Sequence, residues 1–187
     1  MIAMTRQEVI TALVRMMRPL GPEGDPAQRE DEEAAWATHA AGDARTMRAL
    51  VDLARNPPSE AERGRSSADE FQTQLVHVLS VASAHAPAAV LSQVGPLTED
   101  PKTRAISIEI IGAIGDPAGL RWLASLVDVD DLSDDEATWL ASSLGDIGTA
   151  EASVLLEWLA TRAAGERANV HREIQIARDA IARRGVR

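Results

Sequence analysis

The sequence predicts an all-α protein, namely one right-handed α-solenoid of about four helical hairpins with additional terminal helices. Apolar residues recur at helical spacing along most of the chain, whereas the alternation typical of strands is nearly absent. Aromatic residues make up only 3%, with no Tyr and one Phe, which is scarce for a protein built on a sheet. In the second half of the chain a glycine pattern recurs after 33 residues, and a period of this length is typical of stacked helical hairpins.

Length and composition favour a single domain that spans residues 1–187. The chain has no cysteine, which excludes disulfides, thiolate metal ligands and a cysteine nucleophile. Charged residues interrupt the amino-terminal apolar pattern, and no apolar run reaches the length of about eighteen residues that a membrane span needs. We therefore expect a cytoplasmic protein without a secretory signal or a membrane helix.

Capping boxes mark two helix starts in the first half of the chain. Thr5 with Glu8, and Ser67 with Glu70, pair a hydroxyl N-cap with an acid three residues later, just before apolar residues at helical spacing. The polar segment 57–66 lacks helical spacing and predicts a loop insertion. The helices predicted for this half cover residues 5–20, 30–41, 43–56, 67–84 and 87–94.

Two glycine pairs define the clearest repeats, which cover residues 101–131 and 132–164. Gly112 and Gly115 flank an Ala-Ile pair, and 33 residues later Gly145 and Gly148 flank Asp-Ile. In each pair we expect the first Gly to permit close packing of two helices and the second to adopt the left-handed conformation that ends a helix. A further helix is predicted from residue 166 to about 184.

The first of these repeats resembles a known family. The residues that carry the resemblance to the short HEAT-like repeat, which is also found in phycobilin lyases, are Arg104-Ala105, Gly112-x-Ile114-Gly115-Asp116-Pro117-Ala118, Leu123, Leu126 and Asp128. The resemblance implies an α-solenoid in which the second helix of each hairpin lies on the concave side. The second repeat departs from it at Thr149-Ala150, where Asp-Pro would be expected. Such repeats serve many roles, so the fold implies no single activity.

The segment 128–136, DVDDLSDDE, holds six acidic residues in nine positions. It does not fit a calcium loop, because Ser133 stands where the sixth-position Gly is needed and Trp139 where the bidentate Glu is needed. Ser133 with Glu136 instead predicts a capping box that starts a helix. Asp128, Asp130 and Asp131 precede the cap, and we expect them to form a negative ridge.

Two tryptophans are displaced from the apolar stripes of their predicted helices. Trp122 and Trp158 each lie about 100° from the stripe centre, where they would flank the concave surface or, alternatively, fill gaps between repeats. Trp36 and Trp139 are expected in the core. Arg45 and Arg48 would face a partner or neutralise neighbouring acids. The candidate partner-binding residues are Arg45, Arg48, Arg121, Trp122, Asp128, Asp130, Asp131, Glu157 and Trp158.

No motif for a nucleophile, a phosphate-binding loop or a metal site is present in the sequence, so we expect no catalytic, cofactor-binding or metal-binding residues. Residues 21–150 hold 23 acids against nine bases, which disfavours nucleic acid as a partner. The predicted function is a non-catalytic protein–protein interaction module or adaptor. A more specific form is an acidic inhibitor or immunity factor for a basic protein, and the alternative is a phycobilin-lyase-like or chromophore-handling enzyme. The oligomeric state stays open.

Overall fold

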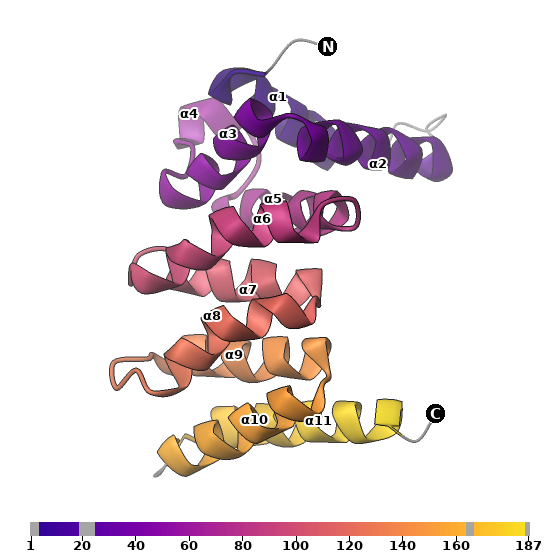
Figure 1. Cartoon of the computed structure of the whole chain (residues 1–187). Coiled ribbons are helices and arrows are strands. Elements are labelled where there is room, and N and C mark those ends of the chain that lie inside the picture. Colours follow the sequence, from indigo (N-terminus) through magenta and orange to yellow (C-terminus); the bar gives the residue numbers. More distant parts are fainter. Residues whose placement is uncertain (1–3, 19–24, 164–166, 186–187) are drawn as a thin grey trace. The chain divides into compact units, whose positions relative to one another are not determined.

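The computed structural model describes residues 4–18, 25–163 and 167–185, and all regular structure within these ranges is helical (Figure 1). This confirms the all-α prediction for the described part of the chain. The chain divides into two compact units, Met1–Gln93 and Val94–Arg187. None of the helices in the described ranges has the length and apolar character required to cross a membrane.

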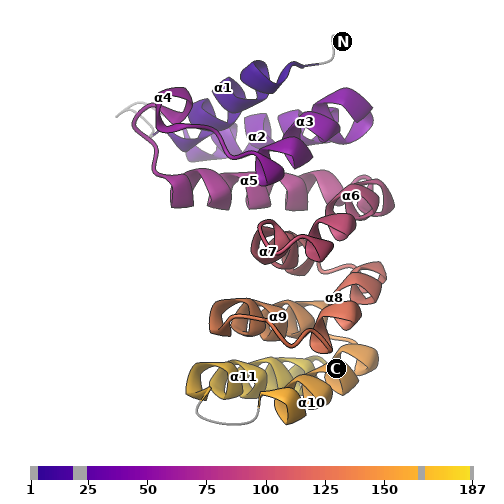
Figure 2. The same cartoon turned by 90° about the vertical axis from the view of Figure 1, so that its left-hand side faces the viewer.

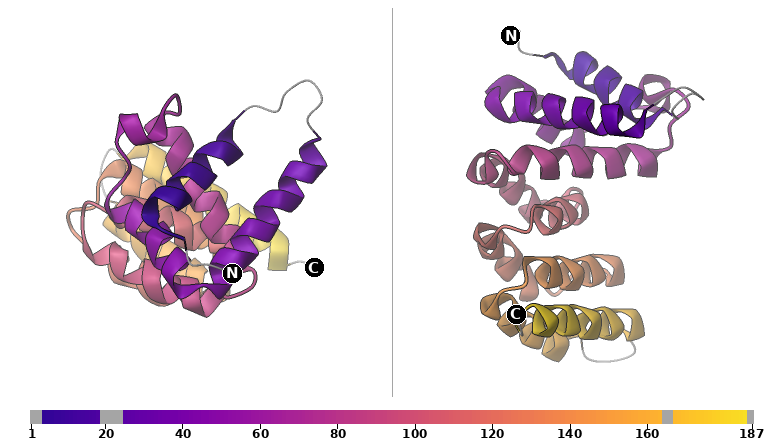
Figure 3. Two further views of the ribbon diagram at one scale, coloured as in Figure 1. Left: turned by 90° about the horizontal axis from the view of Figure 1, so that it is seen from above. Right: turned by 90° about the vertical axis from the view of Figure 1, so that its right-hand side faces the viewer.

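The first unit holds six helices among its described residues, and α5 packs against α1, α2 and α3. Figure 3 shows α2 lying along α5. The core of this unit includes the fully buried side chains Ile10, Leu13, Leu50, Leu53, Leu75 and Leu79. The helices are α1 (Arg6–Met17), α2 (Pro26–Gly42), α3 (Ala44–Arg55), α4 (Glu60–Arg63), α5 (Ala68–Ser83) and α6 (Pro87–Val94).

Two elements of the first unit differ from the sequence prediction. Helix α2 begins at Pro26 rather than near residue 30, because the Asp25 side chain accepts a hydrogen bond from the Ala27 N–H and Pro26 suits the first turn. The segment 57–66, expected as a loop, contains the single helical turn α4. Ser59 and Glu62 start this turn with a capping box that the sequence analysis overlooked.

The second unit consists of helical elements that pack in two rows. Helix α9 packs between α7 and α11, while α8 packs against α10 and against the 3₁₀ turn η1 (Figure 2). The elements are η1 (Gly95–Glu99), α7 (Arg104–Ile114), η2 (Pro117–Gly119), α8 (Leu120–Val127), α9 (Asp134–Ile147), α10 (Ala150–Arg162) and α11 (Ala168–Gly185). The capping box of Ser133 and Glu136 opens α9 as predicted.

The glycines adopt the roles predicted for them. A Cβ atom on Gly112 would lie 2.9 Å from the Ser143 Cα on α9, and one on Gly145 would lie 2.8 Å from the Ala177 Cβ on α11. These two positions therefore permit α7 to approach α9 and α9 to approach α11. Gly115 and Gly148 end α7 and α9 in the left-handed conformation, with φ of 66° and 70°.

Candidate protein-binding surfaces

The acid-rich segment after α8 is paired with arginines of its own unit. Arg162 on α10 donates to Asp128 over 2.9 Å and to Asp130 over 3.1 Å. The buried Arg104 donates to Asp131 over 3.1 Å and, through Nε, to the Thr98 carbonyl over 3.3 Å. These guanidinium groups offset much of the negative charge that the sequence predicts for the ridge. In the described ranges, no cluster of three or more His, Cys, Asp or Glu side chains is placed to hold a metal ion.

Trp122 fills a gap inside the second unit. Its indole covers Gly95 of η1 so closely that a Cβ atom on this glycine would collide with the ring. The guanidinium carbon of Arg121 lies 4.9 Å from the centre of the same ring, within cation–π range. The indole Nε1 is buried and has no hydrogen-bond partner within the described residues. Of the two roles considered for Trp122, its packing corresponds to the gap-filling one.

Trp158 lies on the surface. It is 55% exposed, and Val154, one turn earlier on α10, is 52% exposed. Residues four apart share a helix face, so the two side chains form one apolar pair in contact with solvent. The neighbouring candidate Glu157 forms an ion pair with Arg178 of α11, with Oε2 and the guanidinium nitrogen 2.6 Å apart.

A hollow of about 390 Å³ lies between α8 and α10. Its lining includes Arg121 and Ala124 from α8 and Glu151 and Leu155 from α10. Because Glu151 and Leu155 share α10 with Val154 and Trp158, this helix presents both a hollow and an exposed apolar pair. We call this part of the second unit the α8–α10 face; of the predicted candidates, it includes Arg121 and Trp158.

Arg45 and Arg48 belong to α3 of the first unit, where both are exposed.

Two further tryptophans depart from the prediction. Trp139 is 37% exposed rather than in the core, because the buried stripe of α9 follows Leu140 and its helical neighbours and leaves Trp139 about 100° to one side. Trp36 is half-buried, because the α2 face that carries it borders an open groove.

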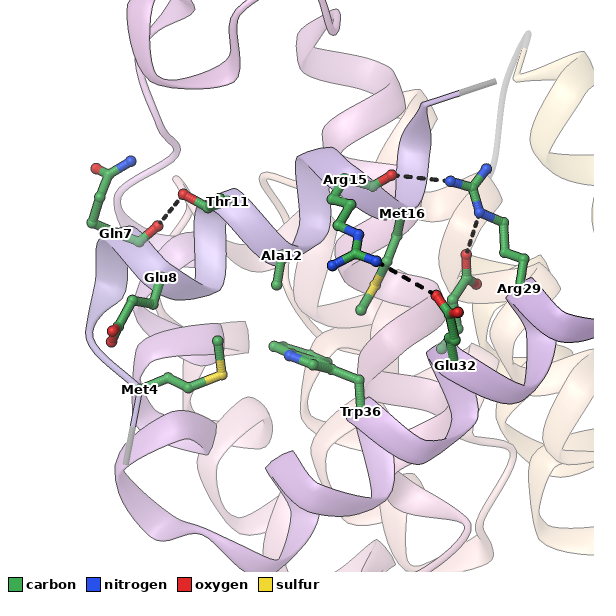
Figure 4. A pocket seen from close by; sticks show the side chains of 11 residues that line it. Met4, Gln7, Glu8, Thr11, Ala12, Arg15, Met16, Arg29, Glu32 and Trp36 are labelled. Carbon is green, nitrogen blue, oxygen red and sulfur yellow. Dashed lines mark hydrogen bonds and ion pairs between the residues drawn. The ribbon is translucent and has the colours of Figure 1, made fainter. Parts of the chain in front are cut away.

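The groove in the first unit lies between α1 and α2 and has a volume of about 640 Å³ (Figure 4). Met4, Ala12, Met16 and Trp36 supply its apolar surface. The Met16 sulfur accepts a hydrogen bond of 3.9 Å from the Gln74 amide on α5, which lies beneath both helices. The groove thus has apolar side chains on both walls, with an aromatic one, Trp36, on the α2 wall.

Charged side chains link the two walls at one end of this groove. The Arg15 guanidinium lies 3.9 Å from the Glu32 carboxylate across the groove. Arg29 donates to the Arg15 carbonyl over 3.0 Å and to the Arg18 carbonyl, which ties α2 to the end of α1. In Figure 4, Met4 and Glu8 lie toward the other end, and Trp36 lies between the two ends. One ion pair and two hydrogen bonds thus connect the two walls at the Arg15 end of the groove.

The groove could not be predicted from the apolar pattern of α2, which places Trp36 in the core. An apolar stripe shows which face of a helix is covered, but it does not show whether the neighbouring helix is close enough to cover it completely. The run of four acids at 30–33, which ends three residues before Trp36, is the feature of the sequence that indicates solvent on this side of α2.

A scan against protein-family models, a search of curated proteins and a search of solved structures each found no match to this chain.

Proposed function

We propose that the protein is a non-catalytic protein-binding module of the HEAT-like α-solenoid type, acting in the cytoplasm. The observation that carries the proposal is the exposed pair of Trp158 and Val154 on α10, both more than half exposed. A tryptophan in water forgoes the free energy of burying a large apolar side chain, and such residues dominate the binding energy of many protein interfaces. We therefore assign the α8–α10 face as the partner-binding surface.

The surroundings of Trp158 suit a protein partner. The hollow between α8 and α10 can receive a partner side chain, and its lining residue Leu155 lies about one turn before Trp158 on α10. Arg121 and Glu151 line the same hollow and supply one charge of each sign at its border. An apolar centre bordered by charged groups is the usual composition of a specific interface.

The repeated packing of the second unit supports the solenoid type. Gly112 on α7 and Gly145 on α9 are 33 residues apart, and each permits a close contact with the next helix. About one turn later, Gly115 ends α7 and Gly148 ends α9 in the left-handed conformation. Repetition of both contacts at one period is expected when each hairpin packs only on its neighbours. The net charge of −10 favours a basic partner, as an inhibitor or immunity factor would have.

The test compares two tryptophan variants. Purified wild type, Trp158→Ala and Trp139→Ala are each used to capture proteins from native lysate, with quantification by mass spectrometry. Loss of a central interface tryptophan costs about 2 kcal/mol or more, so Trp158→Ala should reduce capture of the specific partner by about 30-fold. Trp139→Ala removes an exposed tryptophan of the same unit and should leave capture unchanged. Equal capture by wild type and Trp158→Ala would contradict the assignment of this face.

A further inference from the structure

We infer that the groove between α1 and α2 binds a second element of a protein partner: one amphipathic helix with basic residues beside its apolar face. The inference rests on the proposed function as a protein-binding module, but it concerns a surface of the first unit that shares no residue with the α8–α10 face.

The walls of the groove have helical spacing on both sides. The α1 wall presents Glu8, Ala12 and Met16, each one turn after the last, and the α2 wall presents Arg29, Glu32 and Trp36 at turn spacing. The α1 wall runs about 12 Å from Glu8 to Met16 at the usual rise of 1.5 Å per residue. This length fits two to three turns of a bound helix, which would place apolar residues at positions i, i+3 or i+4, and i+7.

The apolar residues of the groove favour side chains over a rigid small molecule. Met4 and Met16 have unbranched, flexible side chains that can adjust to aliphatic residues of different shape, as methionines do at helix-binding grooves. Trp36 supplies a flat apolar wall against which a Leu or Ile side chain can pack. Such a surface fits the apolar stripe of a helix.

The charges around the groove favour a cationic ligand. Glu8 lies exposed on the α1 wall and Glu32 on the α2 wall, and α2 carries the consecutive acids Glu30, Asp31, Glu32 and Glu33. Two arginines also line the groove, and each lies near a lining carboxylate: Arg15 is 3.9 Å from Glu32 and Arg29 is 4.0 Å from Glu33. With Glu8 as the third lining carboxylate, the lining keeps an excess of negative charge. Lys or Arg residues beside the apolar stripe of a bound helix would meet carboxylates on both walls, whereas an acidic helix or a fatty-acid carboxylate would be repelled.

The probe for a direct test is a fluorophore-labelled Leu/Lys peptide of about 15 residues, with Leu at i, i+3, i+4 and i+7 spacing. Its fluorescence anisotropy is titrated with the full chain at low and at high salt. We expect micromolar binding that weakens with salt. A Leu/Glu peptide with the same spacing and a scrambled Leu/Lys peptide should bind at least about 10-fold more weakly.

Variants then locate the site. Trp36→Ala should weaken binding of the Leu/Lys peptide by about 10-fold or more. Trp139→Ala removes an exposed tryptophan of the other unit and should leave this binding unchanged. The double variant Glu8→Gln, Glu32→Gln should weaken binding several-fold and flatten its salt dependence, and Gln at position 8 can still complete the capping box with Thr5. Glu60→Gln with Asp69→Asn changes net charge equally and serves as the matched control. Circular dichroism of each variant checks that it remains folded.

The inference would be overturned by no binding of the Leu/Lys peptide to the wild type, by equal binding of the Leu/Glu peptide, or by equal binding of the Leu/Lys peptide to folded Trp36→Ala. Displacement of an apolar dye by decanoate but not by the peptide would assign the groove to a lipid instead, and would also overturn it. In any of these cases a loss of partner capture by Trp158→Ala would still support the proposed function. If peptide binding depends on Trp36 but Trp158→Ala captures the partner as well as wild type does, the α8–α10 face would be rejected as the partner-binding surface. The groove would then remain as the supported binding site.

Discussion

At the scale of single residues, hydrogen bonds to one carboxylate hold the segment 57–66 against α1. The Ser59 backbone N–H and hydroxyl each donate to Glu62 over 2.8 Å, and Arg6 on α1 donates to it over 2.7 Å. The Ser59 backbone N–H, the Ser59 hydroxyl and Arg6 together lower the pKa of Glu62 from its ordinary value of 4.5 to about 2. Arg6 also donates to the Asn56 carbonyl over 2.8 Å, so this arginine holds both Glu62 in the segment and the residue just before the segment.

This pKa predicts a pH-dependent contribution to stability. Because the folded pKa of Glu62 lies below its unfolded value, the stabilisation is fully present above pH 4.5 and is lost as the pH falls toward 2. Glu62→Gln should therefore be less stable than wild type at pH 7, and the difference should shrink between pH 4.5 and 2. Urea unfolding across this range measures it. Glu60→Gln removes an exposed carboxylate of the same turn and controls for net charge; a Glu62→Gln difference that stays constant down to pH 2 would contradict the argument.

A second residue-scale prediction concerns the left-handed glycine that ends α7. Gly115 has a φ of 66°, and the nearest atom to an added Cβ is the Gly112 carbonyl oxygen at 3.8 Å, so Gly115→Ala adds backbone strain without a collision. The cost should be about 1–2 kcal/mol in the free energy of unfolding. Gly42→Ala is the matched control, because Gly42 is helical with no atom within 4 Å of an added Cβ. It should be neutral or slightly stabilising, and equal effects of the two variants in thermal unfolding would refute the role of φ.

At the scale of helices, the second unit depends on the close contacts of α9 with α7 and with α11. Helix α9 contacts α7 through Ser143, whose hydroxyl donates to the Ile108 carbonyl over 3.0 Å beside Gly112. It contacts α11 through Gly145, opposite Ala177. The same helix therefore uses small residues on both sides, one for each neighbour, and a larger side chain at either site separates a helix pair.

The contact of α9 with α11 can be tested by a paired substitution. Gly145→Ala places a Cβ atom 2.8 Å from the Ala177 Cβ and should destabilise the fold by about 1–3 kcal/mol. Adding Ala177→Gly removes the opposing methyl group, so the double variant should be more stable than the sum of the two single variants predicts. Chemical unfolding of all four proteins gives this coupling energy. Strict additivity would show that the two helices do not press on each other at this point.

At the scale of the whole molecule, local patterns predicted the helices well and the surfaces poorly. Capping boxes at Thr5, Ser67 and Ser133 are signals within four residues, and all three were found as expected. The positive φ values of Gly115 and Gly148 follow from equally local chemistry. The open groove beside Trp36 depends on the spacing of α1 and α2, which are joined through residues 19–24 outside the described ranges, and no local pattern encodes that spacing.

The predicted partner-binding residues show the same limit. Helical periodicity places Trp122 and Trp158 at similar angles from their apolar stripes, yet one covers a buried glycine and the other lies in solvent. The difference arises because Trp122 faces Gly95, which has no side chain and leaves room for an indole. The pairing of Asp128 and Asp130 with Arg162 spans more than thirty residues in sequence, so the acid run alone could not reveal it.

The distribution of indoles makes the chain a source of its own optical probes. The protein has no tyrosine, so its near-ultraviolet emission comes from four tryptophans, and Trp36 is the one that lies within residues 1–93. Emission from the first unit is thus the emission of one residue in one groove. Trp158, at 55% exposure, is open to collisional quenchers such as iodide, whereas the indole nitrogen of Trp122 is shielded from them. Comparing the unlabelled wild type with Trp36→Ala and with Trp158→Ala therefore gives the emission from each of the two proposed surfaces by difference.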